Sequence, residues 1–389
     1  MALLRGASRL KDPRLRGLFY QTAFVVVICG LAVGAARNAY LNMLARGIPL
    51  GFGFWNEVAG FDINIHLIPY SPLSTYGRAF WVGLLNTLLV AAICIPLATL
   101  AGFTLGVARL SPNWLLARSA LAYTTVIRNT PLLLQLLFLY NAVLKTLPAP
   151  RQSIDVVKVI YLNNRGLFLP APSARPAAIW FVMTLALSLA LALIFRAWAR
   201  WRQDRTGVQT PVTLVVTAIV VGGPAVGILV AGPPITFTVA ELSGFNLKGG
   251  IQIIPEMAAL VCGLVTFTAA FIAEIVRAGV RAVPQGQSEA AFALGLRRGL
   301  TTKLIVLPQA LRLIIPPLTS QYLNIVKNSS LAVFIGYPDL VQIFAGTVLN
   351  QTQAAVQVMA ITMAVYLLIS LVVAAALNVY NVKYALLER

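Results

Sequence analysis

Charged and chemically reactive side chains are scarce in this sequence. Asp, Glu, Lys and Arg make up 11% of its 389 residues, whereas soluble domains carry about 25%, so an ordinary soluble fold is excluded. The single histidine is His66, and the three cysteines, Cys29, Cys94 and Cys262, lie in separate apolar stretches, which indicates neither a disulfide framework nor a metal site. No G-x-x-x-x-G-K-[ST] motif is present. We therefore expect no cofactor on this chain and no enzymatic activity of its own.

Long apolar runs are abundant instead. Hydrophobic residues make up 59% of the chain, and about 20 mainly apolar residues suffice for a helix to cross a bilayer. The stretch Ser329–Gly346 is apolar, but Gly336, Pro338 and Asp339 interrupt it, which favours a bent or re-entrant segment over a further crossing. We predict an all-α integral membrane protein with eight transmembrane helices, at Gly17–Ala36, Phe80–Ala108, Asn129–Lys145, Pro176–Phe195, Val212–Ala231, Glu256–Val276, Leu313–Asn328 and Ala354–Asn378.

Basic residues predict the orientation. The net charge is +19, and Lys and Arg collect in alternate loops, as expected of loops that stay in the cytoplasm. With eight spans, both termini lie on the cytoplasmic side, together with the basic loops 109–128, 196–205 and 277–312. We interpret the charges as determinants of membrane topology rather than as a nucleic-acid surface. Tryptophans such as Trp114 lie near predicted span ends, where they anchor the chain in the lipid interface.

The loop after the sixth span has the breaks and caps of a short helix. Pro284 and Gly286 interrupt the chain, Ser288 can cap a new helix, and Gly295 can end it. The pattern predicts two helical turns that could dock into a groove of a partner. Small and apolar side chains would make that contact: Ala290, Ala291, Phe292, Ala293 and Leu294.

This loop resembles a known motif. Glu289-Ala290-Ala291, then Gly295, Ile305 and Leu307-Pro308, is similar to the EAA motif of ABC-importer permeases. The resemblance implies a coupling helix that contacts a dimer of separate ATPase subunits, which bind ATP and Mg. The alternative is an ordinary amphipathic helix at the membrane surface. The residues that the resemblance assigns to the ATPase contact are Glu289, Ala290, Ala291, Gly295 and Arg297.

Further segments resemble the polar amino-acid branch of these permeases. They are Ala273-Glu274-Ile275-Val276-Arg277, Val283-Pro284-Gln285-Gly286-Gln287, Asn86-Thr87, Arg128-Asn129-Thr130-Pro131 and Lys327-Asn328-Ser329-Ser330-Leu331. The resemblance covers 80–145 and 256–378, which implies the five-helix core of a type I ABC importer and three additional helices. The predicted organisation is an N-terminal tail, extra helix and external segment (1–78), the first part of the core (79–145), an insertion with two extra helices (146–255), and the second part with the coupling loop (256–389).

The extra helices make this a long form, similar to permeases of general or acidic L-amino-acid systems. That resemblance implies location in a bacterial inner membrane, a periplasmic substrate-binding protein, and pairing with a second, different permease. A secondary amino-acid transporter is the alternative, but such proteins usually show related halves and intramembrane acids for ion coupling, and neither is evident here.

Polar residues in the seventh span are candidates for substrate contact. Gln321, Asn324 and Asn328 fall on one helical face, and Lys327 could attract a substrate carboxylate. Asn86 in the second span joins them as a candidate. In similar permeases that are selective for cationic amino acids, the positions that match Gln321 and Asn328 look acidic. The resemblance therefore implies neutral or acidic substrates, over a broad range, for this chain. The alternative is that these amides bond between helices.

Overall fold

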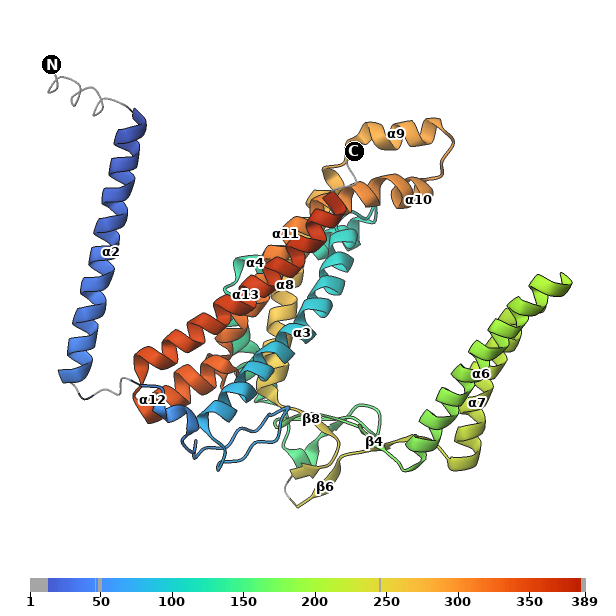
Figure 1. The fold of residues 1–389 in the computed structure, drawn as a ribbon, viewed down its shortest axis with the longest axis horizontal. Coiled ribbons are helices and arrows are strands. Elements are labelled where there is room, and N and C mark those ends of the chain that lie inside the picture. The colour runs from blue at the N-terminus through green and yellow to red at the C-terminus, as the bar shows by residue number, and fades with distance from the viewer. Residues whose placement is uncertain (1–12, 46, 48–50, 245, 386–389) are drawn as a thin grey trace. The chain divides into compact units, whose positions relative to one another are not determined.

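The computed structural model describes residues 13–45, 47, 51–244 and 246–385. The described residues of 1–125 and 268–389 form one compact unit, and those of 126–267 form a second. Figure 1 shows the elements of both. The predicted cytoplasmic tails lie largely outside the described residues, and the predicted domain boundaries at 78, 145 and 255 stay predictions.

Most of the chain is helical, as predicted. Among the described residues, seven helices are long and apolar enough to cross a membrane by themselves. They lie at Gly17–Ala45 within α2 (Pro13–Ala45), α3 (Tyr76–Ala108), α6 (Ala177–Thr206), α7 (Val212–Ala231), α8 (Pro255–Arg281), the stretch Arg298–Ile335, which includes α11 (Leu307–Asn328), and Ala355–Val379 within α13 (Ala355–Ala385). An eighth span results only when a bent helix pair is counted as one.

That bent pair corrects the predicted third span. Asn129–Lys145 is not one helix, because α4 (Trp114–Asn129) ends there and α5 (Leu132–Leu137) begins after a break, followed by a π-helical turn, η2 (Phe138–Leu144). Pro131 lacks an N–H and disfavours helical geometry at Thr130. The side-chain amide of Gln135 donates to the freed carbonyls of Ile127 at 3.0 Å and Thr130 at 2.9 Å.

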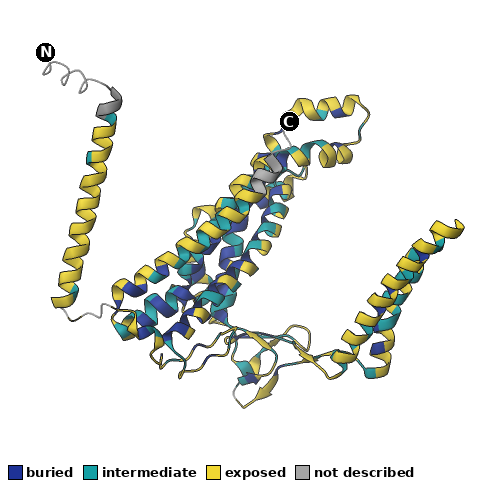
Figure 2. Ribbon diagram, viewed as in Figure 1, coloured by how far each residue is buried: buried dark blue, intermediate teal, exposed yellow. Residues whose placement is uncertain are grey.

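Glycines bring the helices of the first unit into close contact. A Cβ on Gly102 of α3 would lie 2.5 Å from the Cβ of Ile272 on α8, and one on Gly106 would lie 2.7 Å from that of Val276. Contacts this short mean that only glycine fits without a shift. Figure 2 shows buried residues along the inner faces of this helix bundle, whereas α2 is exposed all round, as expected of a helix in lipid.

The segment 51–75, predicted to be external, packs onto the same unit. It contains a short 3₁₀ helix, η1 (Gly53–Asn56), and Phe54 is buried. The rings of Trp55, Phe80 and Phe344 meet at centroid distances of 5.2 to 6.0 Å. Thr75 caps α3 by accepting a hydrogen bond from the backbone N–H of Arg78. This segment therefore covers one end of α3 rather than extending freely into solvent.

The predicted re-entrant segment is a turn, as expected. A 3₁₀ helix, η5 (Ser329–Ile335), continues α11 and ends at Gly336, whose φ is +78°. After Tyr337-Pro338-Asp339 the chain enters a π-helical stretch, η6 (Val341–Val348), then α12 (Leu349–Thr352) and α13.

The second unit contains short strands that the sequence patterns did not predict. They form a four-stranded antiparallel sheet of order β1-β2-β3-β8 and two antiparallel pairs: β6-β7, a hairpin, and β4-β5, whose strands are separated in the chain by α6 and α7. In this unit α6 and α7 pack closely, since a Cβ on Gly227 would lie 2.5 Å from Thr184 Oγ1. The strands are β1 (Ile154–Asp155), β2 (Tyr161–Asn163), β3 (Gly166–Leu169), β4 (Ala171–Ala174), β5 (Ile235–Thr238), β6 (Glu241–Ser243), β7 (Asn246–Lys248) and β8 (Ile251–Ile253).

Candidate functional site

The loop after α8 folds as a helical hairpin. It consists of α9 (Gln285–Ala293), α10 (Arg298–Thr301) and a π-helical turn, η4 (Thr302–Val306), that leads into α11. Figure 1 shows α9 and α10 lying beyond the end of the bundle. The helix begins four residues earlier than predicted: Pro284, with no side-chain hydrogen bond, occupies the cap position assigned to Ser288. The backbone carbonyl of Pro284 accepts from the N–H of Gln287 at 3.1 Å, which closes the first turn without a side-chain cap.

The end of α9 matches the prediction. Gly295 has a φ of +78°, a conformation that costs other residues strain. Its N–H donates to the carbonyl of Phe292 at 2.9 Å, and the N–H of Leu296 donates to that of Ala291 at 3.1 Å. These bonds satisfy carbonyls at the helix end. Gly295 thus sets the turn that returns the chain toward α10.

The hairpin leaves apolar side chains exposed. Phe292 and Leu294 are 46% and 82% exposed to solvent. Ala291 is buried, whereas Glu289, Ala290 and Arg297 are exposed. A large apolar side chain that the chain itself does not cover suits contact with another protein.

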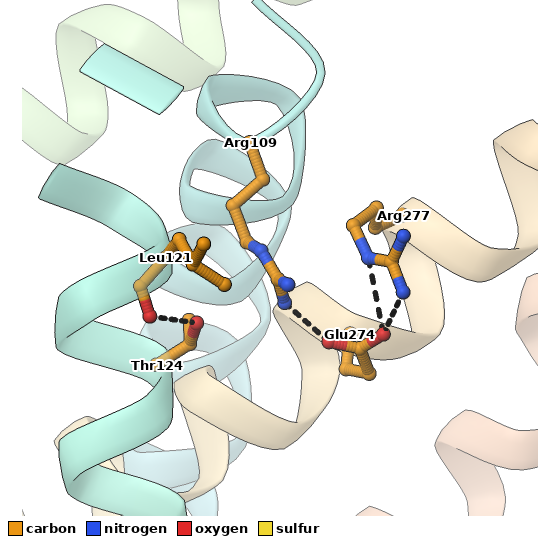
Figure 3. A network of polar contacts seen from close by, with 5 residues as sticks. All are labelled: Arg109, Leu121, Thr124, Glu274 and Arg277. Atoms are coloured by element: carbon orange, nitrogen blue, oxygen red, sulfur yellow. Dashed lines mark hydrogen bonds and ion pairs between the residues drawn. The ribbon is translucent and has the colours of Figure 1, made fainter. Parts of the chain in front are cut away.

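Ion pairs connect α8, the helix before this hairpin, to the end of α3; we call Arg109, Glu274 and Arg277 the ion-pair node. The carboxylate of Glu274 on α8 pairs with Arg109, which follows α3, and with Arg277 one turn further along α8 (Figure 3). The Nε of Arg277 donates to Glu274 Oε1 at 3.0 Å. Glu274 therefore joins a partner one helical turn away on its own helix to one at the end of α3. The identity of Arg109 was missed; its position at the end of an apolar span was the available signal.

Helix α8 also contacts α11 directly. A Cβ on Gly279 would lie 2.4 Å from Cγ1 of Ile314. Both residues belong to faces that are buried between the two helices, and Ala310 one turn before Ile314 is fully buried as well. The helix that carries the hairpin is therefore packed without free space against the helix that carries the polar stripe.

The polar stripe lies on α11 as predicted. Asn324 and Lys327 are exposed, and Gln321 and Asn328 are half-buried. On the same helix, the hydroxyl of Tyr322 lies 2.9 Å from that of Thr99 on α3, which fixes the rotation of α11. Asn324 and Lys327 of the stripe thus face outward from the helix bundle.

Asn86, the candidate in the second span, lies on α3 apart from the stripe. Its side chain is fully buried, and its amide nitrogen donates to the carbonyls of Ile65 and Pro338, both at 2.8 Å. The backbone carbonyl of Asn86 accepts from the hydroxyl of Tyr337. A buried amide needs such partners, so Asn86 fastens the external segment and the re-entrant turn to α3.

Asp339, which was not a predicted site residue, also holds the turn after η5 in place. Its carboxylate accepts from the backbone N–H of Gln342 at 2.8 Å and from the hydroxyl of Tyr366 on α13 at 3.1 Å. The hydroxyl of Thr87 accepts from the N–H of Leu340. The turn that follows the polar stripe is therefore held from α3 on one side and α13 on the other.

Comparison with known proteins decides the family. The family model described as "Binding-protein-dependent transport system inner membrane component" matches residues 95–384. The chain belongs to this family. The permease is thus a multi-pass membrane subunit of such a transport system, and the secondary-transporter alternative is not favoured.

Relatives match the permease over nearly its whole length. It is 46% identical to the "General L-amino acid transport system permease protein AapQ" of Rhizobium johnstonii, over 98% of this chain and 95% of the relative. It is 38% identical to the "Glutamate/glutamine/aspartate/asparagine transport system permease protein BztB" of Rhodobacter capsulatus, over 97% and 96%. The permease protein BztC, which carries the same system name in the same organism, is 33% identical over 52% of this chain and 50% of the relative.

Proposed function

We propose that the permease forms half of the translocation pathway of an ATP-driven L-amino-acid importer. The observation that carries the proposal is the α9–α10 hairpin, whose apolar side chains Phe292 and Leu294 are exposed while the turn at Gly295 is firmly set. In this proposal α9 docks into a cleft of an ATPase subunit, through Glu289, Ala290, Gly295 and Arg297. Ala291, which the resemblance also assigned to this contact, is 1% exposed and packs inside the hairpin instead. ATP and Mg bind to the ATPase dimer, not to this chain.

The packing of α8 supports a path from α9 to the pore. Closure of the ATPase dimer moves α9, and α8 continues directly into that loop. Because Gly279 contacts Ile314 and Glu274 holds Arg109, a displacement of the α8 end changes the positions of α11 and α3 together. The energy for this change comes from the ATP bound to the partner, since a partner shifts conformations only by binding one of them better.

We further propose a second permease and a periplasmic binding protein as partners, because this chain forms only half of the translocation pathway. The exposed polar stripe of α11 needs a second permease opposite it, because polar side chains are costly against lipid. We propose a different chain rather than a second copy, since BztB and BztC are two permeases of one named system and this chain resembles both. A periplasmic binding protein delivers the substrate from the side opposite α9, and both termini face the cytoplasm.

The proposed substrate is a neutral or acidic L-amino acid over a broad range. Lys327 supplies a positive charge for a carboxylate, and the side-chain amides of Gln321, Asn324 and Asn328 supply donors and acceptors for the rest of the molecule. The names of AapQ and BztB, which refer to general L-amino acids and to Glu, Gln, Asp and Asn, support this range.

Two substitutions at equally exposed leucines test the docking helix. Leu294 in the hairpin and Leu73 in the external segment are 82% and 83% exposed. The permease is co-expressed with its partners and purified through a tag, and the ATPase that remains bound is quantified. We expect Leu294→Asp to reduce bound ATPase at least about tenfold, because a charge is buried without a partner in the cleft, and Leu73→Asp to retain it. Equal retention by both variants would exclude α9 as the docking helix.

A further inference from the structure

A cationic cleft lies beside the ion-pair node. It is a hollow of about 370 Å³ between the end of α3, the start of α4 and the end of α8. Figure 3 shows Arg109, Glu274 and Arg277 near Leu121 of α4. Four arginines contribute to its lining, with apolar residues of α4 between them: Arg109, Arg118, Arg277 and Arg281, and Trp114 and Leu121.

The charges of this cleft are not balanced within the node. Arg109 and Arg277 pair with Glu274, but Arg118 and Arg281 make no ion pair within the part of the chain that the structure describes. The four arginines and Glu274 together carry a formal charge of +3, that is, four positive and one negative. Like charges at close range repel. An anion in the hollow would relieve this repulsion.

The location of the cleft indicates which kind of anion it takes. Arg109 directly follows the span that ends at Ala108, and Arg281 is the last residue of the α8 span. Trp114, at the start of α4, is 71% exposed, and exposed Leu115 and Leu116 follow it. Tryptophan at the end of a span marks the level of lipid headgroups. The cleft thus combines cationic and apolar surface at that level.

We propose that this cleft binds the headgroup of an anionic phospholipid. The guanidinium groups of Arg118 and Arg281 hold the phosphate oxygens, as Arg can do with two parallel hydrogen bonds. Trp114 and Leu121 contact the glycerol backbone and the first carbons of the acyl chains. Basic pockets between transmembrane helices suit such headgroups. The inference goes beyond the transport function and does not depend on it.

Binding of a lipid here has a structural consequence for the hairpin. Arg281 ends α8 only a few residues before α9 begins at Gln285. A lipid that bridges Arg118 of α4 and Arg281 of α8 therefore fixes the root of the loop that carries α9.

The test measures lipid binding to the full chain in a neutral detergent, without ATPase or substrate, by native mass spectrometry and by the shift in Tm. Probes are phosphatidylglycerol, phosphatidylcholine and water-soluble glycerol phosphate. The double variant Arg118→Gln/Arg281→Gln is compared with Arg298→Gln/Lys303→Gln, which removes the same charge from exposed positions outside the cleft.

We expect wild type and the control variant to bind phosphatidylglycerol at least about tenfold more tightly than phosphatidylcholine. The affinity of the cleft variant for phosphatidylglycerol should fall about 10- to 30-fold, because each of the two removed Arg side chains contributes a similar share of the binding to an anionic lipid. The affinity of Arg118→Lys/Arg281→Lys for phosphatidylglycerol should lie between those of wild type and the Gln variant, because Lys keeps the charge but cannot form two parallel hydrogen bonds to a phosphate. This Lys variant replaces the Gln variant in the test if the Gln variant does not fold.

Two outcomes would overturn the proposal. Equal phosphatidylglycerol affinity in the cleft and control variants would mean that these arginines hold no lipid. Displacement of phosphatidylglycerol by an equal concentration of glycerol phosphate would mean that the cleft is a site for a soluble phosphate. Because no transport step is measured, either result leaves the proposed import function to its own test.

Discussion

Arg109 and Glu274, which are 165 positions apart in the sequence, form an ion pair in which the side chain of Arg109 is only 9% exposed. The pair joins the end of α3 to α8, and Arg277 shares the same carboxylate. Loss of the carboxylate would leave two guanidinium groups facing each other at a partly buried position.

We therefore expect Glu274→Gln to destabilise the protein by about 1–3 kcal/mol, less than a fully buried pair would cost because Glu274 is partly exposed. Thermal unfolding of the purified permease in detergent measures the effect as a lower Tm. Glu289→Gln, at an exposed position on α9, serves as the control and should leave Tm unchanged. Equal Tm values for the two variants would contradict a stabilising node.

The close contact of α3 and α8 predicts the effect of one added methyl group. Gly102→Ala places its Cβ against Ile272, which overpacks the helix pair and costs about 1–3 kcal/mol. Gly222→Ala, in the interior of α7 with no atom within 4 Å of the new Cβ, should be neutral or stabilising by up to about 1 kcal/mol. Both are measured by Tm. The second-site change Ile272→Ala should recover part of the loss in Gly102→Ala, and no recovery would argue against this contact as the cause.

The left-handed backbone of Gly295 predicts a graded series. No atom lies within 4 Å of a Cβ placed there, so only the φ of +78° opposes substitution. Gly295→Ala should cost about 1–2 kcal/mol of local strain, whereas Gly295→Asn should cost less because Asn tolerates this conformation. Amino-acid-stimulated ATPase activity of the assembled importer should follow the order Gly, Asn, Ala. Gly299→Ala, at an open position without positive φ, is the control, and a loss equal to that of Gly295→Ala would refute a conformational cause.

The charge of Lys327 predicts substrate discrimination. If Lys327 attracts a substrate carboxylate, Lys327→Gln should raise the KM for glutamate about tenfold more than the KM for glutamine, because only glutamate carries a second negative charge. Uptake of the two labelled amino acids into vesicles with the complete importer gives both values. Lys303→Gln, which removes an exposed charge in η4, should change neither. Parallel changes for both substrates would show that Lys327 does not distinguish the side-chain charge.

The sequence predicted the features that depend on local patterns. Apolar length fixes a helix in lipid because every backbone group must bond within the segment, so seven predicted spans coincide with long apolar helices. Their ends were predicted less well: α2 and α6 end nine and eleven residues after the predicted ends at Ala36 and Phe195, and α11 begins six residues before Leu313. The helix end at Gly295 also needs only neighbours along the chain.

Only the tertiary structure decided which distant residues meet. Asn86 was a candidate for substrate contact from its sequence segment, and only the tertiary structure shows that its amide nitrogen donates to the carbonyls of Ile65 and Pro338. Likewise Arg109 meets Glu274 because α3 and α8 pack closely at Gly102 and Gly106. Arg118 of α4 and Arg281 of α8 line one hollow although they are far apart in the sequence. Apolar periodicity determines that a helix has a buried face, but the shapes of both partners determine which helix it contacts and in what register.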